Sequence, residues 1–329
     1  MHRLALILTL AAAMFAVTFW RESGPARSTE QRVEFADLMP QFQGRPPKLG
    51  AATLTGAWLL SSNNDDFSGY SALGRLADGR FLTVSDRNSF LIFPAPAAGN
   101  STAPAKLHKL FTGNPRQERW ELDAEALTID PASREIWLAF EDAKSFWAFA
   151  PDMIQRQRIA APVLLNWRGN AGPEAMTRLA DGRFLVVIEA RESLPAGSRH
   201  PALLYPATPH PDQMPLRFTI EMPAGFRPTD AAPLPDGRAL VLGRDWSMDG
   251  FASVIGLADV SQVKAGTAVP IREIARITDH RIRDNYEGMM VEPGLAGSAT
   301  IWLISDNNQA IWLQRNLLLR LSLPLSRLK

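Results

Sequence analysis

Acidic residues recur at one end of five short segments, each of which has the pattern of a strand, a turn and a second strand. The first strands begin at or near a hydroxyl or a carboxylate: Ser71, Glu125, Glu174, Asp230 and Glu287. The second strands end at or near a charged residue: Asp86, Glu141, Glu189, Arg244 and Asp306. Because the open ends of a hairpin's two strands lie side by side, we expect these side chains to gather there.

Carboxylates gathered in this way can hold a hard cation. Like charges that face each other across a strand pair destabilise it by about 0.2–1 kcal/mol, and they raise one another's pKa values. A bound cation removes that cost, and oxygen ligands without cysteine or paired histidine suit calcium or another divalent cation. The candidate metal ligands are therefore the acids of the first strands: Glu125, Glu174, Asp230 and Glu287.

Other residues beside these acids can act on a substrate. Glu189, Asp306 and Asp86 are candidate catalytic residues that would serve as general bases. The candidate substrate-binding residues are three neighbouring arginines, Arg87, Arg191 and Arg244, because a guanidinium can bind a phosphate through two parallel hydrogen bonds. The simpler alternative is that the acids only cap strand ends and pair with these arginines. Their recurrence at the same hairpin end favours a site.

The elements that would position these residues follow from a heptapeptide that occurs twice. Arg-Leu-Ala-Asp-Gly-Arg-Phe fills residues 75–81 and again residues 178–184. Asp-Gly between apolar runs predicts a two-residue hairpin turn in which both turn residues have positive φ. Such turns, with a three-residue turn centred on Ser133, predict these cross-strand partners: Ser71 with Asp86, Glu125 with Glu141, Glu174 with Glu189, and Glu287 with Asp306.

The spacing of the hairpins predicts the fold class. The first-strand positions are separated by 54, 49, 56 and 57 residues, which is the period of β-propeller blades and not of a helical solenoid. Residues 53–60 form a strand without a hairpin partner, which would close the ring by pairing with the last blade. Five hairpins plus one blade shared by the termini predict an all-β propeller of six blades over residues 50–325, with five or seven as alternatives.

Composition excludes several classes of function. The 329-residue chain has a net charge of +1 and no cysteine, so it has no basic excess for nucleic acid, no disulfide and no thiolate chemistry. No Gly-x-Ser-x-Gly, P-loop or His-Glu-x-x-His motif occurs, which argues against serine hydrolases of that type, nucleotide hydrolases and zincins. We expect a monomer that acts on a small molecule.

The N-terminus predicts export. A short basic start, residues 1–3, precedes an uncharged apolar run from Leu4 to Trp20, which has the pattern of a signal peptide or of a short membrane anchor. Either segment, taken as residues 1–20, places the protein in the periplasm or on the outer side of the cytoplasmic membrane. Residues 21–49 are polar and are expected to form a linker.

Five ordered motifs resemble the phytase-like domain family, the proteins described as "esterase-like activity of phytase". They lie at residues 67–73, 123–127, 172–176, 227–232 and 285–289, and each is followed by the expected strand end. The resemblance runs from about residue 50 to residue 325. The chain departs from the family at Ser71, where an acid is missing, and at Asp142-Ala-Lys144, where a more basic stretch is expected.

The resemblance implies an exported propeller hydrolase of the phosphodiesterase or phytase kind, acting on a phosphoester or related ester. Two alternatives remain open. One is a propeller without catalytic activity that binds a ligand or protein at the same face. The other is a lactonase-type hydrolase, because Glu287-Gly288 is similar to the pair in gluconolactonase-type propellers, where a glutamate in the tunnel holds a divalent cation.

Overall fold

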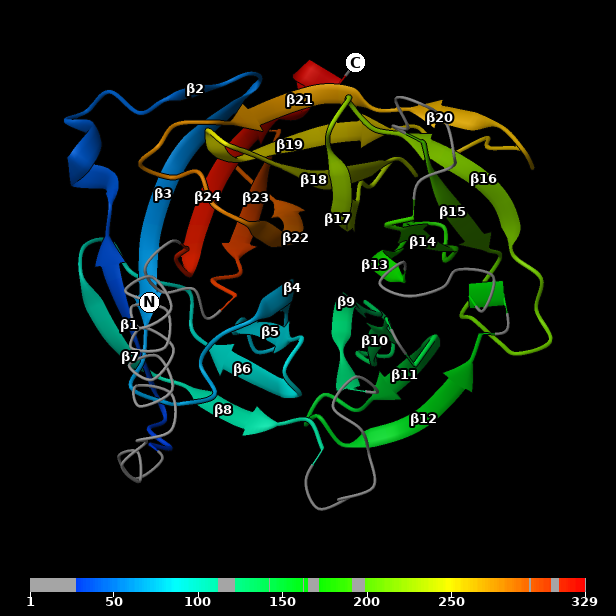
Figure 1. Cartoon of the computed structure of the whole chain (residues 1–329), viewed down its shortest axis with the longest axis horizontal. Helices are drawn as coiled ribbons and strands as arrows, with labels where there is room; N and C mark the ends of the chain where they lie inside the picture. Colours follow the sequence, from blue (N-terminus) through cyan, green and yellow to red (C-terminus); the bar gives the residue numbers. More distant parts are fainter. Residues whose placement is uncertain are drawn as a thin grey trace, which may run out of the picture.

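The computed structural model describes residues 28–111, 122–141, 143–161, 163–164, 172–190, 199–295, 297–308 and 314–328. These residues form five sheets around a common axis (Figure 1). We number the sheets as blades 1 to 5, in the order in which their innermost strands occur. The predicted class, an all-β propeller, is confirmed.

Each blade is built mainly from antiparallel strands that follow one another in the chain. Blade 1 contains β4 (Tyr70–Arg75), β5 (Phe81–Ser85), β6 (Ser89–Phe93) and β8 (Lys106–Lys109). Blade 2 contains β9 (Ala124–Ile129), β10 (Ile136–Phe140), β11 (Ser145–Phe149) and β12 (Gln155–Ala160). Blade 3 contains β13 (Pro173–Arg178), β14 (Phe184–Ile188), β15 (Arg199–Tyr205) and β16 (Leu216–Glu221), with the parallel strand β20 (Ala268–Pro270) at its edge.

The last two blades complete the ring. Blade 4 contains β17 (Arg227–Pro233), β18 (Ala239–Ser247), β19 (Gly250–Ala258) and β21 (Arg272–Ile277). Blade 5 contains β22 (Tyr286–Pro293), β23 (Ser298–Ser305), β24 (Leu317–Pro324) and β3 (Ala52–Ser61), extended by β2 (Lys48–Leu49), β1 (Arg32–Asp37) and β7 (Ser101–Pro104). Two short 3₁₀ helices, η1 (Met39–Phe42) and η4 (Leu325–Leu328), flank this blade's strands in the chain.

The two ends of the chain meet in blade 5. As predicted, the strand near residues 53–60 closes the ring, because β3 pairs with β24 with Trp58 opposite Leu318. The last hairpin, β22–β23, belongs to the same sheet, so the termini complete the fifth blade and do not add another. The six-blade prediction is therefore wrong for the described residues. The innermost strands β4, β9, β13, β17 and β22 contact one another in that order, and β22 returns to β4.

Part of the segment expected to be a linker belongs to the fold. Strand β1 lies within residues 21–49, pairs with both β3 and β7, and buries Phe35 to 2% exposure. The linker prediction is therefore wrong for β1, η1 and β2. The apolar run of residues 4–20 lies outside the described residues. Within the described ranges, no helix has the length and apolar character needed to cross a membrane.

The core is divided into five apolar layers, one between each pair of neighbouring blades. Because each sheet is covered on both faces, β5, β10 and β14 are buried along their whole length. This explains why those segments are continuous apolar runs instead of alternating ones. Large aromatic residues pack within these layers and are at most 3% exposed: Trp137, Phe140, Phe146, Trp147 and Trp302.

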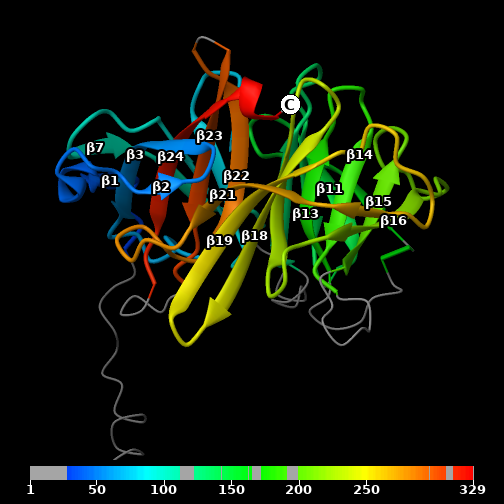
Figure 2. The same ribbon diagram turned by 90° about the horizontal axis from the view of Figure 1, so that it is seen from above.

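The propeller has two different faces (Figure 2). The innermost strands all run in one direction, so their Asp-Gly turns lie together at one face and their first residues lie together at the other. We call the first the tip face, which holds Gly79, Gly182 and Gly237. We call the second the acid face. The β18–β19 hairpin projects beyond the other blades at the acid face.

Candidate active site

The Asp-Gly turns share a geometry that differs from the predicted one. Leu76 N donates to Arg80 O at 2.9 Å and Gly79 N donates to Leu76 O at 3.0 Å, so the loop has three residues. Only Gly79 has a positive φ, 84°, while the Asp78 carboxylate accepts hydrogen bonds from Arg80 N and Nε. The turns at Gly182 and Gly237 repeat this arrangement. A type I turn followed by a left-handed glycine shifts every cross-strand partner by one residue.

A β-bulge near the start of each innermost strand adds a second shift. In β13, Pro173 pairs with Ile188 and Ala175 pairs with Val187, which leaves Glu174 as the extra residue. The same irregularity occurs at the equivalent place in all five innermost strands: the extra residues are Ser71, Glu125, Glu174, Thr229 and Glu287. A bulge changes the direction of a side chain and often lies next to an active site.

Asp230 does not occupy the position that the sequence analysis gave it. Thr229 is the extra residue of β17, and its hydroxyl donates to Tyr286 O at 3.1 Å. Asp230 is 1% exposed, and its two carboxylate oxygens accept hydrogen bonds from Ala231 N at 2.7 Å and Met289 N at 2.6 Å. Asp230 therefore links β17 to β22, and these contacts give it a place in the packing of the strands.

The ends of the second strands supply the second set of acids. Each of these acids donates its backbone N–H to a carbonyl at the start of the innermost strand. The four hydrogen bonds are Asp86 to Gly69 at 3.0 Å, Glu141 to Asp123 at 3.0 Å, Glu189 to Gly172 at 3.2 Å, and Asp306 to Asn285 at 2.9 Å. In blade 4, Arg244 pairs with Arg227. The predicted cross-strand partners are thus wrong by two residues, one from the turn and one from the bulge. Among these pairs, two acids face each other only in blade 2.

Glu141 lies at the centre of a group of five carboxylates from blades 2 and 3. One ligand oxygen from each of Asp123, Glu125 and Glu141 lies within 4.8 Å of the other two, and the same holds for Glu141, Glu174 and Glu189. Glu141 is only 4% exposed. We call these five residues the Glu141 cluster. The structure thus brings together Glu125, Glu174 and Glu189 from the sequence analysis, through a residue that had no assigned role.

Gly172 makes the close approach of the two blades possible. Its N–H donates to Glu141 Oε1 at 3.1 Å. A methyl group on Gly172 would lie 2.1 Å from Glu141 Cγ and 2.8 Å from its Cα, so any side chain there would displace Glu141. Gly69 has the equivalent role in blade 1, where an added Cβ would lie 2.0 Å from Asp86 Oδ1.

Blade 4 supplies positive charge where blades 2 and 3 supply negative charge. Arg227 NH1 lies 2.9 Å from Glu189 Oε1, and Arg244 Nε lies 3.3 Å from Glu287 Oε1. Asn285 Nδ2 donates to Glu287 Oε1 at 2.8 Å. A cavity of about 370 Å³ beside the two arginines is lined by Gly225, Arg227, Arg244, Asp245 and Trp246. An anionic group can thus approach guanidinium groups that lie next to the carboxylates.

The acids raise one another's pKa values. Burial first, and then the charges of Asp123 and Glu287, raise the pKa of Asp86 to about 7. Burial, followed by Glu174, Asp123 and Glu287, raises the pKa of Glu125 well above its usual value. Burial and neighbouring acids likewise raise the pKa of Glu174. A site with this many shifted carboxyls favours protons or a cation.

Glu287 connects the Glu141 cluster to the acids of blades 1 and 5. Burial raises the pKa of Glu287, although Arg244 and Asn285 oppose the shift. Burial and then Glu287 raise the pKa of Asp306. Burial alone would lower the pKa of Arg244, but Glu287, Glu174, Glu189 and Glu125 raise it overall. Asp86, Asp306 and Arg244 therefore interact electrostatically with the clustered acids of the acid face.

The other arginines and the missed residues have clear positions. Arg87 is exposed next to Asp86, and its charge opposes the rise in the pKa of Asp86. Arg191 lies outside the described residues.

Three residues of the site were not among the candidates from the sequence: Asp123, Glu141 and Arg227. Asp123 and Arg227 each occur two residues before a bulge, so counting back from Glu125 and from Thr229 would have identified them.

The donor set of the Glu141 cluster fits a hard divalent cation. All five side chains offer carboxylate oxygens, and calcium binds six to eight oxygens at about 2.3–2.6 Å. Ligand oxygens around one such ion lie at most about 5 Å apart, and each of the two groups of three that share Glu141 meets this condition, with oxygens within 4.8 Å of one another. The cluster lacks the histidine and cysteine ligands that zinc prefers.

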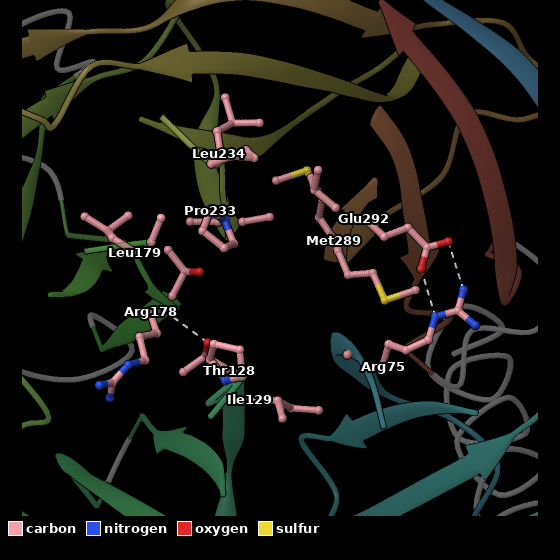
Figure 3. A pocket seen from close by; sticks show the side chains of 18 of the residues that line it. Arg75, Thr128, Ile129, Arg178, Leu179, Pro233, Leu234, Met289 and Glu292 are labelled. Carbon is pink, nitrogen blue, oxygen red and sulfur yellow. Dashed lines mark hydrogen bonds and ion pairs between the residues drawn. The ribbon is translucent and has the colours of Figure 1, made fainter. Parts of the chain in front are cut away.

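The other end of the central channel has different chemistry. At the tip face, a cavity of about 700 Å³ is lined mostly by apolar residues of the innermost strands, including Leu127, Leu179 and Met289. Charged groups in its wall are paired: Arg75 with Glu292 at 2.8 Å (Figure 3). Arg178 pairs with Asp130, also at 2.8 Å. The clustered carboxylates thus mark the acid face as the place of the candidate active site.

Comparisons with known proteins agree with the sequence motifs. A family model described as "Phytase-like: Esterase-like activity of phytase" matches residues 65–309. No curated protein matches the chain.

Among solved structures, the PQQ-bound aldose sugar dehydrogenase from Streptomyces coelicolor is 12% identical, with a TM-score of 0.43 and coverage of 84% of this chain and 99% of that chain. A catalytically inactive virginiamycin B lyase from Staphylococcus aureus is also 12% identical, with a TM-score of 0.42 and coverage of 85% and 82%. Hydrazine synthase from Kuenenia stuttgartiensis is 12% identical at a TM-score of 0.37, and the match covers 74% of this chain but only 58% of that chain. Likenesses this loose do not indicate a function.

Proposed function

The chain belongs to the phytase-like family, "Esterase-like activity of phytase", and we propose that it is an exported, divalent-cation-dependent hydrolase of phosphoesters or related esters. The observation that carries this proposal is the arrangement at the acid face. Five carboxylates of the Glu141 cluster lie beside two arginines, Arg227 and Arg244, which pair with Glu189 and Glu287. Negative groups for a cation and positive groups for an anion thus share one site.

The Glu141 cluster would hold the cation, with calcium as the first candidate. When bound, such a cation polarises an ester oxygen and lowers the pKa of a bound water. The choice of cation follows from the all-oxygen donor set. Glu287 lies next to the cluster, and its contacts with Arg244 and Asn285 hold it there. Asp230 is not part of this proposal.

The arginines of blade 4 would bind the anionic part of the substrate. Guanidinium groups match phosphate and carboxylate oxygens through two hydrogen bonds. Arg244 is held by Glu287 and Arg227 by Glu189, so both guanidinium groups are positioned before a substrate arrives. The cavity beside them has room for the ester.

Asp86 would transfer a proton during the reaction. Its pKa of about 7 means that it can both accept and donate a proton near neutral pH. Asp306 remains a candidate for the general base, because it belongs to the ring at the acid face, whereas Glu189, the other candidate from the sequence, belongs to the cluster that would hold the cation. Export rests on the basic start and the apolar run of residues 4–20.

A substrate panel tests this proposal. Metal-free protein should be supplied with calcium, magnesium, manganese or zinc and offered an aryl phosphodiester, a phosphomonoester, an aryl carboxylate ester and a lactone. We expect turnover of a phosphoester that needs the cation and is lost in Glu141→Gln, whereas Asp181→Asn at the tip face retains it.

Two outcomes would replace the proposal. Turnover of the lactone alone would identify a lactonase. No turnover of any substrate, with a ligand still bound at the acid face, would indicate a propeller that only binds.

A further inference from the structure

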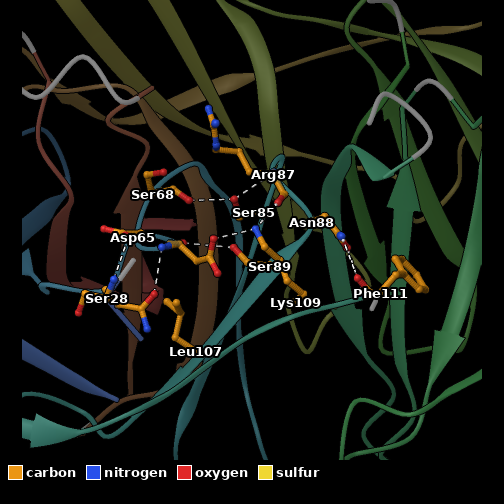
Figure 4. A network of polar contacts seen from close by, with 12 residues as sticks. Ser28, Asp65, Ser68, Ser85, Arg87, Asn88, Ser89, Leu107, Lys109 and Phe111 are labelled. Carbon is orange, nitrogen blue, oxygen red and sulfur yellow. Dashed lines mark hydrogen bonds and ion pairs between the residues drawn. The ribbon is translucent and has the colours of Figure 1, made fainter. Parts of the chain in front are cut away.

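The described chain begins at the acid face. Ser28 N donates to Asp65 Oδ2 at 2.9 Å, and Asp65 N donates to Ser28 O at 3.2 Å (Figure 4). Asp65 belongs to the loop that leads into β4, whose first residues lie at the acid face. Nearby, Gln31 Oε1 accepts a hydrogen bond from Leu107 N at 2.7 Å. The segment that contains Ser28 and Gln31 is therefore hydrogen-bonded to blade 1 and its entry loop, with Ser28 at the acid face.

The extended chain between Trp20 and Ser28 is only slightly longer than an innermost strand of the propeller. Seven residues, 21–27, separate Trp20 from Ser28, and a fully extended chain of that length reaches at most about 25–30 Å. An innermost strand between its bulge and its Asp-Gly turn covers roughly 23 Å. If residues 4–20 remain in a membrane, the chain before Ser28 is long enough for the acid face to lie on the bilayer. To lead along the outside of the molecule to the tip face, the same residues would have to be almost fully extended.

The part of the acid face that projects farthest carries two exposed apolar side chains. Strand β18 has nine residues, whereas the equivalent strands β5, β10 and β14 have five each and β23 has eight. Trp246 is 69% exposed and Met248, at the turn, is 102% exposed. Met248 lies four residues after Arg244, and an extended strand of that length covers about 13 Å. The turn therefore lies about 13 Å beyond Arg244. The β18–β19 hairpin projects beyond the other blades (Figure 2); Met248 lies at its turn, and Trp246 lies between the turn and the cavity beside Arg244.

This pair differs from the other exposed apolar residues in the described ranges. Ile154, Met214 and Leu295 are also exposed, but each lies in a separate turn at the tip face. Single exposed apolar residues are normal on protein surfaces. Tryptophan is enriched at the boundary between water and lipid because its ring is apolar and its N–H is polar.

We propose that residues 4–20 are retained as a membrane anchor and that the propeller lies with its acid face toward the bilayer, with Trp246 and Met248 in the head-group region. The membrane is the occupant of this surface because the chain enters at the same face from which the apolar hairpin projects. The orientation does not depend on the catalytic proposal, since an inactive propeller would be held in the same way.

The absence of cysteine from the chain allows a direct test. Full-length Met248→Cys and Leu295→Cys variants, each labelled with a bimane fluorophore, should be reconstituted in phosphatidylcholine vesicles containing a spin-labelled lipid. The two native side chains are similarly exposed, 102% and 90%, and lie at opposite faces. We expect the spin label to quench the fluorescence at position 248 several-fold more strongly than at position 295.

Three results would overturn the proposal. Equal quenching at the two positions would mean that the propeller has no fixed orientation, and stronger quenching at position 295 would reverse it. Recovery of the mature chain without residues 4–20, free of the vesicles, would remove the anchor. Because the readout is fluorescence, none of these results depends on whether the protein hydrolyses an ester.

Discussion

At the scale of single residues, Glu141 connects the two halves of the candidate site. Its carboxylate belongs to both groups of three acids, and it accepts a hydrogen bond from the neighbouring blade at Gly172. Arg244 has the opposite charge and interacts with Glu287, Glu174, Glu189 and Glu125. The chemistry we propose depends on these two side chains more than on any others.

Replacing Arg244 tests the binding of the anionic substrate. We expect Arg244→Gln to raise KM for a phosphoester about 10- to 100-fold, since hydrogen bonds to charged groups contribute about 1.5–3 kcal/mol. The kcat value should change much less. The matched control is Arg183→Gln, whose guanidinium pairs with Asp181 at the tip face at 2.7 Å. A KM that is equal in both variants would contradict the role of Arg244.

Asp86 tests proton transfer through the pH dependence of the reaction. Its pKa of about 7 predicts a limb of the pH–rate profile near neutral pH. We expect Asp86→Asn to lower kcat and to remove that limb, while the affinity for calcium changes little because Asp86 lies outside the Glu141 cluster. A profile that keeps the same limb in Asp86→Asn would assign the proton transfer to another group.

At the scale of elements, the bulged innermost strands determine which side chains meet. The sequence predicted the hairpins, the closing strand and the end of each hairpin that carries acids, because Asp-Gly turns and apolar runs are local signals. It did not predict the register. A three-residue turn and a bulge together displaced each predicted partner by two residues, and Thr229 replaced Asp230 at the equivalent position. Glu174 and Thr229 each lie seven residues before the Asp of their own Asp-Gly turn, whereas Asp230 lies six residues before its turn. Counting back from the turn would therefore have shown that Thr229, and not Asp230, occupies the bulge position in blade 4.

The number of blades was wrong for a related reason. The unpaired strand at residues 53–60 correctly predicted ring closure, but nothing local shows which sheet that strand joins. Pairing between β3 and β24 is a contact between the two ends of the chain. The contact between blades 2 and 3 at Glu141 is likewise long-range, and turn chemistry alone does not reveal it.

Gly172 provides a test at this scale. We expect Gly172→Ala to weaken calcium binding at least tenfold, because the added methyl group would displace Glu141. The control is Gly79→Ala at the tip face, where φ is +84° and no heavy atom lies within 4 Å. That variant should lose about 1 kcal/mol of stability from backbone strain and bind calcium normally. If both variants lose stability and both keep full calcium affinity, Gly172 does not position Glu141 for calcium.

At the scale of the whole molecule, the ring of acids should make stability depend on pH and metal. Burial and neighbouring acids raise the pKa of Asp86 from 3.8 to about 7 in the folded state, so the folded protein binds more protons than the unfolded chain between these values. Stability of the metal-free protein should therefore fall as pH rises from about 4 through 7. Thermal unfolding in a chelator should give a higher Tm at pH 5 than at pH 8, and excess calcium should reduce the difference. A chelated protein that is more stable at pH 8 would contradict this.

The most direct test of the central claim is a calorimetric titration of calcium into the metal-free protein at pH 7. We expect saturable binding accompanied by release of protons, because the cation replaces protons held by the carboxyl groups whose pKa values are raised. At a calcium concentration 100-fold above the dissociation constant, binding should add about 2.7 kcal/mol to the free energy of unfolding. Glu141→Gln should abolish the binding, and Asp181→Asn at the tip face should leave it unchanged. Absence of binding by the wild type, or binding that Glu141→Gln does not affect, would show that the carboxylates of the acid face do not form a cation site.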